Sequence, residues 1–357
     1  TKDTSAQNAI SKMISKYRQF NKDQSKKVSY MVKEYEMKKA AAAYSRTKQD
    51  KSGIIDPLKL HSYKYNDDIF KRMAITPDGK NHGMMMFIDW SGSMQDKMTP
   101  TIHQLMNLTM FCQKVNIPFE VYAFSNDSYN RWDRQSKYET PKGKSHPKYE
   151  DGDITVDERL SLLNFVSSRM NAKEYEKGMI NLFMLSEKFD YTYYSRRRMW
   201  NMDSEAFAKY QEQNDYLNAL PHEPSGYSLA STPLNDCIMA SMPMVNAFRK
   251  RYAIDKMNTI FLTDGSSDGN DRYVTFNPTV DEKELRYMTK QPGGYYISNT
   301  HYESNLVLRD TKTKKEYMTS YREMTDSLLD ALRERTGTKV LGFYIASGKK
   351  IDRYTLE

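Results

Sequence analysis

The chain has 357 residues, of which 38% are hydrophobic and 28% are charged. This length suits one large domain or two ordinary ones, and the composition suits a folded core under a polar surface. No apolar stretch reaches the roughly 18 residues that a membrane-spanning helix needs, and no signal peptide opens the chain. We therefore expect a cytoplasmic protein with no membrane contact.

The positive charge is concentrated at the N-terminal end. Residues 1–51 contain 13 Lys and Arg against 5 Asp and Glu, which accounts for the whole net charge of +8. The remainder of the chain holds 41 residues of each sign. A basic segment of this kind suits nucleic acid or an acidic partner, although a solvated helix face is the simpler interpretation.

Cysteine and histidine give no sign of a disulfide framework or a zinc site. Cys112 and Cys237 are far apart, so we expect two reduced thiols packed in the interior. The six histidines are scattered and show none of the spacings typical of zinc ligands.

Hydrophobic periodicity predicts an alternation of strands and helices after an N-terminal helix. The helix covers residues 6–44, and a turn at 48–53 and short pieces at 58–65 and 69–75 follow it. The predicted strands are residues 84–88, 119–124, 259–263 and 339–346, and the predicted helices are residues 99–115, 233–252 and 321–336. This order predicts a doubly wound, Rossmann-like α/β fold with a mostly parallel sheet covered on both faces.

Two long segments interrupt this alternation and are predicted to be insertions at loops of the sheet. The first, at about 125–224, is predicted to be largely helical, with helices at 157–170, 172–189 and 204–217. The second, at about 268–319, is predicted to contain a hairpin of residues 306–309 and 315–318. We therefore divide the chain into a basic, largely helical arm at 1–80 and an α/β domain at 81–357.

The string from Phe87 to Ser93 carries the clearest chemistry in the sequence. An apolar strand delivers Asp89, and Ser91 and Ser93 follow at alternate positions that point the same way. Gly92 permits a tight turn between the two serines. Hard oxygen ligands of this kind suit Mg²⁺ or Ca²⁺ rather than zinc or copper. Trp90 alternates away from these ligands, so we expect it to pack under the sheet.

Two further strings extend this site. Thr232 precedes a helix that has Pro233 at its first turn, and Asp264 ends an apolar strand. Ligands of open α/β sheets bind outside the carboxyl ends of the strands. We therefore predict a metal site of Asp89, Ser91, Ser93, Thr232 and Asp264 at a surface edge of the sheet, with no catalytic residue in it.

These three strings resemble the metal ion-dependent adhesion site of the von Willebrand factor A (VWA) family, which is written Asp-x-Ser-x-Ser, then Thr, then Asp. The resemblance covers the chain from about residue 84, with the two insertions set aside. It implies a VWA-type sheet that holds Mg²⁺, or Ca²⁺ or Mn²⁺ in its place. It also implies that an acidic residue of a partner protein completes the coordination.

A second resemblance concerns residues 52–60, where Gly53, Asp56, Leu58 and Leu60 stand. This stretch is similar to one in the CobT subunit of cobaltochelatase, and residues 83–124 are similar to CobT-like proteins of tailed phages. The resemblance implies a partner ATPase of the AAA+ class (CobS/MoxR type) in an ATP-dependent chelatase complex. For a phage protein it implies the host cytoplasm.

Other functions remain open at this point. The basic arm and the run of Arg196, Arg197 and Arg198 suit a nucleic-acid-binding protein. A free-standing hydrolase is disfavoured because Ser91 and Ser93 do not stand in a Gly-x-Ser-x-Gly string. The chain also has no phosphate-binding loop of the Gly-x-x-x-x-Gly-Lys type, so it is not itself the ATPase. We expect a binding subunit that is not catalytic alone.

Overall fold

The computed structural model describes most of the chain. Its described residues are 2–46, 48–55, 65, 70–75, 81–126, 149–157, 160–198, 204–221, 227–265, 267, 272–276, 289–290, 296–299, 306–320 and 322–345. Within these ranges, no helix combines the length and the apolar character needed to cross a membrane.

A five-stranded sheet with the order β13-β7-β3-β4-β6 forms the centre of the molecule. Its strands are β3 (His82–Asp89), β4 (Phe119–Asn126), β6 (Leu160–Ser167), β7 (Lys256–Thr263) and β13 (Lys339–Tyr344). β3 runs parallel to β4 and β7, and β13 runs parallel to β7, whereas the edge strand β6 is antiparallel to β4. The prediction of an α/β fold around a mostly parallel sheet is therefore confirmed.

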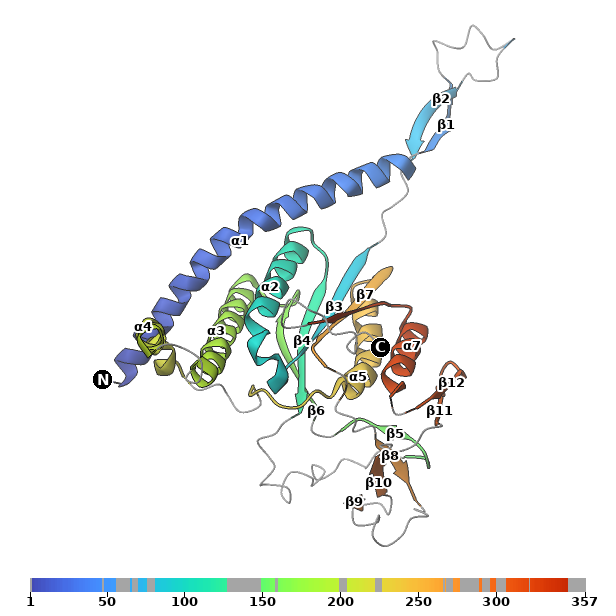
Figure 1. Cartoon of the computed structure of the whole chain (residues 1–357). Helices are drawn as coiled ribbons and strands as arrows, with labels where there is room; N and C mark the ends of the chain where they lie inside the picture. Colours follow the sequence, from blue (N-terminus) through green and yellow to red (C-terminus); the bar gives the residue numbers. More distant parts are fainter. Residues whose placement is uncertain are drawn as a thin grey trace.

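Helices cover both faces of this sheet (Figure 1). They are α2 (Met98–Lys114) and α3 (Ala172–Arg198) on one face, and α5 (Leu234–Arg251) and α7 (Met324–Thr336) on the other. Side chains alternate along a strand, so β3 contributes to two separate cores. Met86 and Ile88 pack with α2 and α3, while Met85 and Phe87 pack with α5 and α7.

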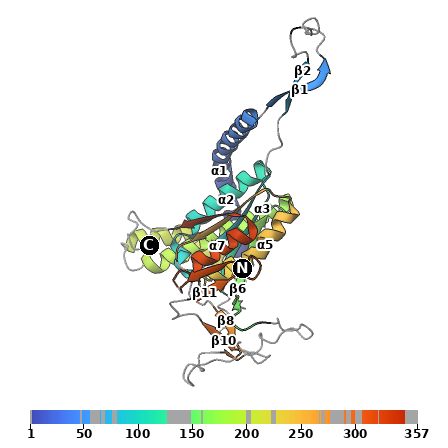
Figure 2. The same cartoon turned by 90° about the vertical axis from the view of Figure 1, so that its right-hand side faces the viewer.

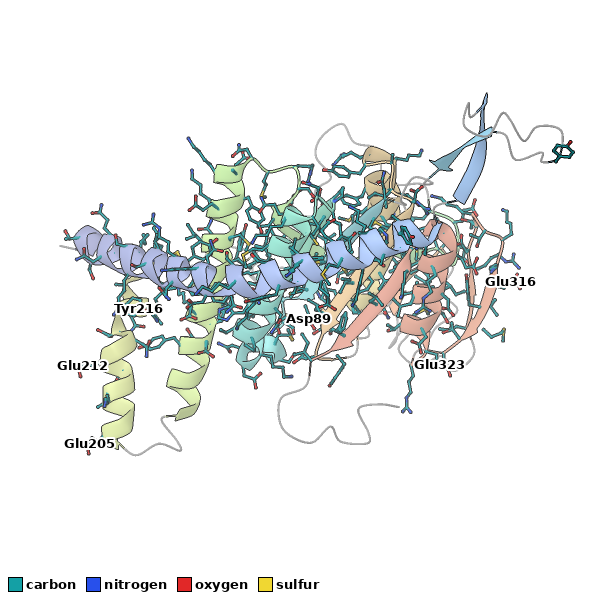
Figure 3. The ribbon with its side chains drawn as sticks, turned by 90° about the horizontal axis from the view of Figure 1, so that it is seen from above. Asp89, Glu205, Glu212, Tyr216, Glu316 and Glu323 are labelled. Atoms are coloured by element: carbon teal, nitrogen blue, oxygen red, sulfur yellow. The ribbon has the colours of Figure 1, made fainter. Side chains whose placement is uncertain are left out.

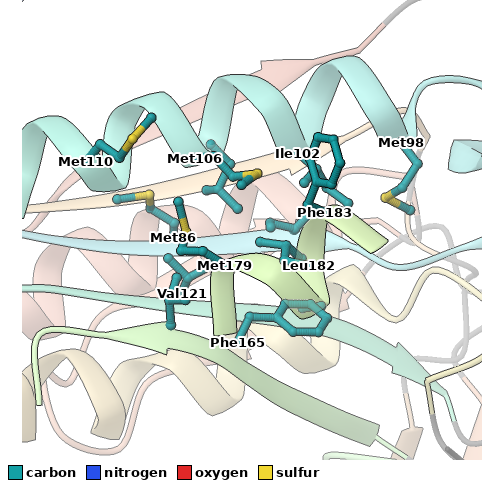
Figure 4. Close-up of a cluster of buried hydrophobic side chains, with 14 of the residues drawn as sticks. Met86, Met98, Ile102, Met106, Met110, Val121, Phe165, Met179, Leu182 and Phe183 are labelled. Atoms are coloured by element: carbon teal, nitrogen blue, oxygen red, sulfur yellow. The ribbon is translucent and has the colours of Figure 1, made fainter. Parts of the chain in front are cut away.

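Methionine fills much of the core between the sheet and the helices α2 and α3 (Figure 4). Met86 of β3, Met98 and Met106 of α2, and Met179 of α3 are almost fully buried. The unbranched thioether side chain adapts to irregular gaps and packs well against aromatic rings. Methionine therefore has a structural role in this layer.

The N-terminal helix α1 (Lys2–Arg46) forms a third layer over α2 and α3. Met13 and Val28 are fully buried against these helices, and the Phe20 ring lies 4.4 Å from the His103 ring. Towards its C-terminal end the helix extends away from the domain, as Figures 1 and 2 show, and Tyr44 is 84% exposed there. The first half of the predicted arm thus belongs to the domain core.

The segment after α1 differs from its prediction. Residues 48–53 were expected to form a turn, but they lie in the strand β1 (Lys48–Ile55), which pairs antiparallel with β2 (Phe70–Ile75). The polar residues of β1 favour a turn locally, and the pairing that makes it a strand comes from residues about 20 positions further on. The predicted piece at 58–65 lies outside the described residues, except for Tyr65.

The prediction for residues 125–224 is wrong in one important part. Residues 157–170 were expected to be helical, but β6 lies there and completes the central sheet beside β4. The helix α3 that follows contributes Met179 and Leu182 to the core, so this part of the segment is not a peripheral insertion. The helix α4 (Ser204–Asn214) and the short 3-10 helix η4 (Asp215–Ala219) lie further out, beside the start of α1.

The second predicted insertion contributes strands to two small sheets. The hairpin of β11 (Leu306–Arg309) and β12 (Glu316–Thr319) is confirmed with antiparallel pairing. A four-stranded sheet has the order β5-β8-β10-β9, and its strands are β5 (Ile154–Thr155), β8 (Arg272–Thr275), β9 (Thr289–Lys290) and β10 (Tyr296–Asn299). Residues from both predicted insertions therefore share one sheet.

Candidate metal centre

Asp89 and Asp264 leave neighbouring parallel strands at the same edge of the sheet. Ile88 of β3 pairs with Leu262 of β7, so the two acids follow one and two positions later. This alignment lets the two acids face one site although they are far apart in sequence. Thr263, the residue before Asp264, is 174 positions from Asp89 and its Oγ1 donates to the Asp89 carboxylate. The carboxyl edge of a parallel sheet is where α/β proteins commonly bind ligands.

The loop after β3 is fixed by backbone hydrogen bonds on both sides. Trp90 N–H donates to Phe124 O at 3.0 Å, and Gly92 N–H donates to Ala230 O at 2.9 Å. Ala230 N–H donates in turn to Trp90 O at 3.2 Å. Thr232 follows Ala230 by two residues and comes just before α5, so this pairing carries it to the same edge of the sheet.

Hydrogen bonds join three of the predicted ligands directly. The Oγ atoms of Ser91 and Ser93 are 3.0 Å apart, and Ser93 Oγ donates to Asp264 Oδ1 at 2.8 Å. Ser91 is buried, whereas Ser93 is exposed. The hydroxyl of Ser93 therefore connects the buried acid to the solvent side of the site.

Asp89 is buried without full hydrogen bonding. Thr263 Oγ1 donates to its Oδ2 at 2.7 Å, but its Oδ1 has no hydrogen-bond partner among the described residues. The pKa of Asp89 is raised to about 6, mainly because burial disfavours the charged form. Hydrogen bonds from the Thr263 and Ser91 hydroxyls oppose this rise in pKa, and the negative charge of Asp264 adds to it.

Lys97 also belongs to the site. Its Nζ donates to Asp264 Oδ2 at 2.7 Å, and only 15% of the lysine side chain is exposed. Lys97 lies between the 3-10 helix η2 (Gly92–Asp96) and α2. The sequence motif did not include it, because a cation in a loop gives no sign of which acid it will contact. Thr263 was missed too, although a hydroxyl residue directly before Asp264 was a usable signal.

The site lies deeper than the expected surface edge. Ser93 is exposed, but the Asp89 side chain is fully buried, and Asp264 and Thr232 are each only 6% exposed. Figure 3 shows Asp89 in the body of the domain, away from the outlying Glu205 and Glu212 of α4. At the end of β3 the next loop pairs with the segment before α5, through the backbone of Trp90, Gly92 and Ala230.

The neighbours of the site behave as expected. Trp90 is fully buried, packs against Phe165 and Phe189, and donates from Nε1 to Tyr227 O at 2.7 Å. Cys112 and Cys237 are both free and buried. Burial raises the pKa of Cys112 to about 12 and that of Cys237 well above the usual range, so both thiols stay protonated.

The donor set fits a hard divalent cation. Asp89 Oδ1 is the only carboxylate oxygen among the buried side-chain atoms that lack a partner in the described part of the chain. A buried acid in this condition is costly unless a donor or a cation compensates it. The described residues contain no group of three or more His, Cys, Asp and Glu that would hold a metal. The remaining donors here are hydroxyls, which suit Mg²⁺, Ca²⁺ or Mn²⁺.

Comparison with known proteins adds little to this geometry. No protein-family model matches the chain, and no curated protein matches it either. Among solved structures, the pilus adhesin SpaC of Lactobacillus rhamnosus GG, in its open conformation, is similar at a TM-score of 0.33 and 12% identity. The match covers 74% of this chain but 24% of the adhesin. A likeness at this level assigns neither a type of fold nor a function.

Proposed function

We propose that the chain is a metal-dependent protein-binding subunit with a VWA-type domain. Asp89, Ser91, Ser93, Thr232 and Asp264 would hold the cation, for which Mg²⁺ is the first choice. When bound, the cation supplies positive charge for a carboxylate oxygen of a partner protein. The observation that carries the proposal is the buried, unpaired Asp89 Oδ1 beside Asp264.

The arrangement of the chain supports this proposal. Asp89 follows the parallel strand β3, Thr232 precedes α5, and Asp264 follows the parallel strand β7. This is the order of elements that the resemblance to the VWA family implies. Ser93 is exposed while the two acids are buried, so an external carboxylate would approach from the side of Ser93.

We further propose a CobT-like role, in which the domain is an adaptor for an AAA+ ATPase of the CobS/MoxR type. The support is the resemblance of residues 52–60 and 83–124, including the phage relatives. In a cobaltochelatase-like complex, catalysis would lie in the other subunits. The chain would contribute the metal-bridged contact between motor and client.

A pull-down tests the adaptor proposal. The purified chain serves as bait in extracts of the cells that express it, with Mg²⁺ or with EDTA, and mass spectrometry identifies what is bound. We expect an AAA+ ATPase with Mg²⁺ only, and none with Asp264→Asn. Glu316→Gln, which removes an exposed acid of β12, should bind like the wild type. Equal recovery in EDTA would refute the metal-bridged contact.

Nucleic-acid binding by the basic arm is the second candidate. Part of the arm's charge is already used within the protein, because Lys16 pairs with Glu187 at 3.6 Å and Lys38 pairs with Glu34 at 2.7 Å. The side chains of Arg196, Arg197 and Arg198 lie outside the described residues. Binding through phosphates weakens steeply as salt is raised. A metal-bridged contact is instead lost on adding a chelator, so the two candidates are distinguishable.

A further inference from the structure

Lys97 is held in place by its own backbone and by Asp264. Its N–H donates to Met94 O at 2.9 Å, and its carbonyl accepts from Thr101 N at 3.1 Å and Thr101 Oγ1 at 2.8 Å. Its Nζ lies 2.7 Å from Asp264 Oδ2, and the Asp264 side chain is 1% exposed. Most surface ion pairs are mobile and weak, but this lysine is shielded and anchored at both ends.

The ammonium group of Lys97 pairs with Asp264, whereas Asp89 has a hydrogen bond from Thr263 and no ion pair among the described residues. Asp264 accepts on both oxygens, from Ser93 and from Lys97. Asp89 has a free Oδ1. Two carboxylates and one ammonium together carry a net charge of minus one. A divalent cation therefore leaves a net charge of plus one, which a single carboxylate from outside neutralises.

We propose that Lys97 sets the affinity and the cooperativity of this site: it weakens the binding of a divalent cation by the protein alone and makes that binding depend on an acidic partner. The inference rests on the proposed metal site. If Lys97 stays in place, it repels the cation across a short distance. If it moves away, its ion pair with Asp264 is lost. Either course disfavours the metal until a partner carboxylate adds its negative charge.

Titration of the full chain with Mn²⁺ alone, followed calorimetrically, tests this proposal. Lys97→Met removes the charge and keeps a similar length, so we expect it to bind Mn²⁺ about tenfold more tightly than the wild type. Lys97→Arg keeps the charge and should bind like the wild type. Lys114→Met removes the lysine at the far end of α2, 17 positions after Lys97 and about 26 Å away at 1.5 Å per residue, and should change nothing. Near-ultraviolet circular dichroism checks that each variant is folded.

A second series replaces chloride by acetate at equal ionic strength, with acetate as the carboxylate probe. Acetate should strengthen Mn²⁺ binding by the wild type more than by Lys97→Met. Equal affinity of the wild type and Lys97→Met, or an equal effect of acetate on both, would overturn the role of Lys97 and leave the metal site standing. If no variant binds Mn²⁺, the proposed metal site itself is wrong. Binding by Lys97→Met without measurable binding by the wild type supports the inference.

Discussion

Asp89 at the edge of the central sheet and Asp310 beside the β11–β12 hairpin are both buried, with 0% and 4% of their surface exposed. Asp310 accepts hydrogen bonds on both oxygens. Arg335 Nε and Nη2 donate to Oδ2 and Oδ1, each at 2.6 Å, and Lys312 N–H donates to Oδ1 at 2.8 Å. Asp89 accepts from Thr263 on Oδ2 and leaves Oδ1 unpaired within the described residues.

The two carboxyls differ in pKa for this reason. The guanidinium of Arg335 holds the pKa of Asp310 well below its usual range, whereas burial raises the pKa of Asp89 to about 6. Asp310 anchors the hairpin to α7, and the protein compensates its charge completely. Asp89 is compensated only in part, so a cation from outside the chain would gain most there.

Glu120 is a second buried acid whose carboxylate oxygens both have partners, like those of Asp310. It is 2% exposed near the start of β4, and Arg169 Nε lies 2.7 Å from its Oε1. Asn164 Nδ2 donates to its Oε2 at 3.1 Å. Two of these three buried acids thus have partners on both oxygens, and the exception is the one at the predicted metal site.

The largest expected effect is on metal binding. Asp89→Asn removes the uncompensated carboxylate, so we expect Mn²⁺ affinity to fall about 100-fold, which corresponds to about 3 kcal/mol. Calorimetric titration measures this change. Asp310→Asn is the matched control and should bind Mn²⁺ like the wild type. An equal loss of Mn²⁺ affinity in both variants would show that the unpaired oxygen of Asp89 does not determine where the metal binds.

The next effect concerns stability. Asp310→Asn breaks the two-pronged contact with Arg335, and we expect the free energy of unfolding in urea to fall by about 2 kcal/mol at pH 7. The folded pKa of Asp310 is lowered, so its contribution is fully present above the unfolded pKa of about 4. It is lost as the pH falls through the folded pKa. The difference between the variant and the wild type should therefore begin to shrink below about pH 4 and vanish only below the folded pKa, and a constant difference would contradict this account.

In the absence of metal, Asp89→Asn should raise the free energy of unfolding, whereas Asp310→Asn lowers it. The folded pKa of Asp89, about 6, lies above its unfolded value, so the charged form destabilises the folded state and the penalty is complete above that pH. We expect the free energy of unfolding to rise by about 1 kcal/mol at pH 7 in EDTA, and this rise should disappear below about pH 4. Urea unfolding at pH 7 and below pH 4, each in EDTA, measures this change. A loss of stability at pH 7 would show that the charge of Asp89 is compensated within the protein.

The smallest effect is expected at an exposed ion pair. Glu316 of β12 pairs with Arg309, and both side chains are more than half exposed. Glu316→Gln should change the free energy of unfolding by less than about 0.5 kcal/mol. It should leave Mn²⁺ binding unchanged. A larger change in the free energy of unfolding would mean that exposure does not explain why this ion pair stabilises less than the Asp310–Arg335 pair.

Much of the fold could be predicted from local pattern. Strands β3, β4 and β7 are apolar runs, and helices α2, α5 and α7 have helical periodicity, so their positions were found within a few residues. β6 was missed because its apolar residues suit a helix as well as a strand. Its pairing with β4 decided the outcome, and that pairing depends on residues about 40 positions away.

The sequence by itself determined the chemistry of the candidate site. Asp89, Ser91 and Ser93 stand at alternate positions after a strand, and Asp264 ends a second strand, so their meeting at one edge follows from parallel pairing. Only the tertiary structure decided that Asp89 is fully buried and that Lys97 reaches Asp264 across 167 positions of sequence. Strand periodicity acts over a few residues, whereas burial and ion pairing depend on which loops close over the end of the sheet.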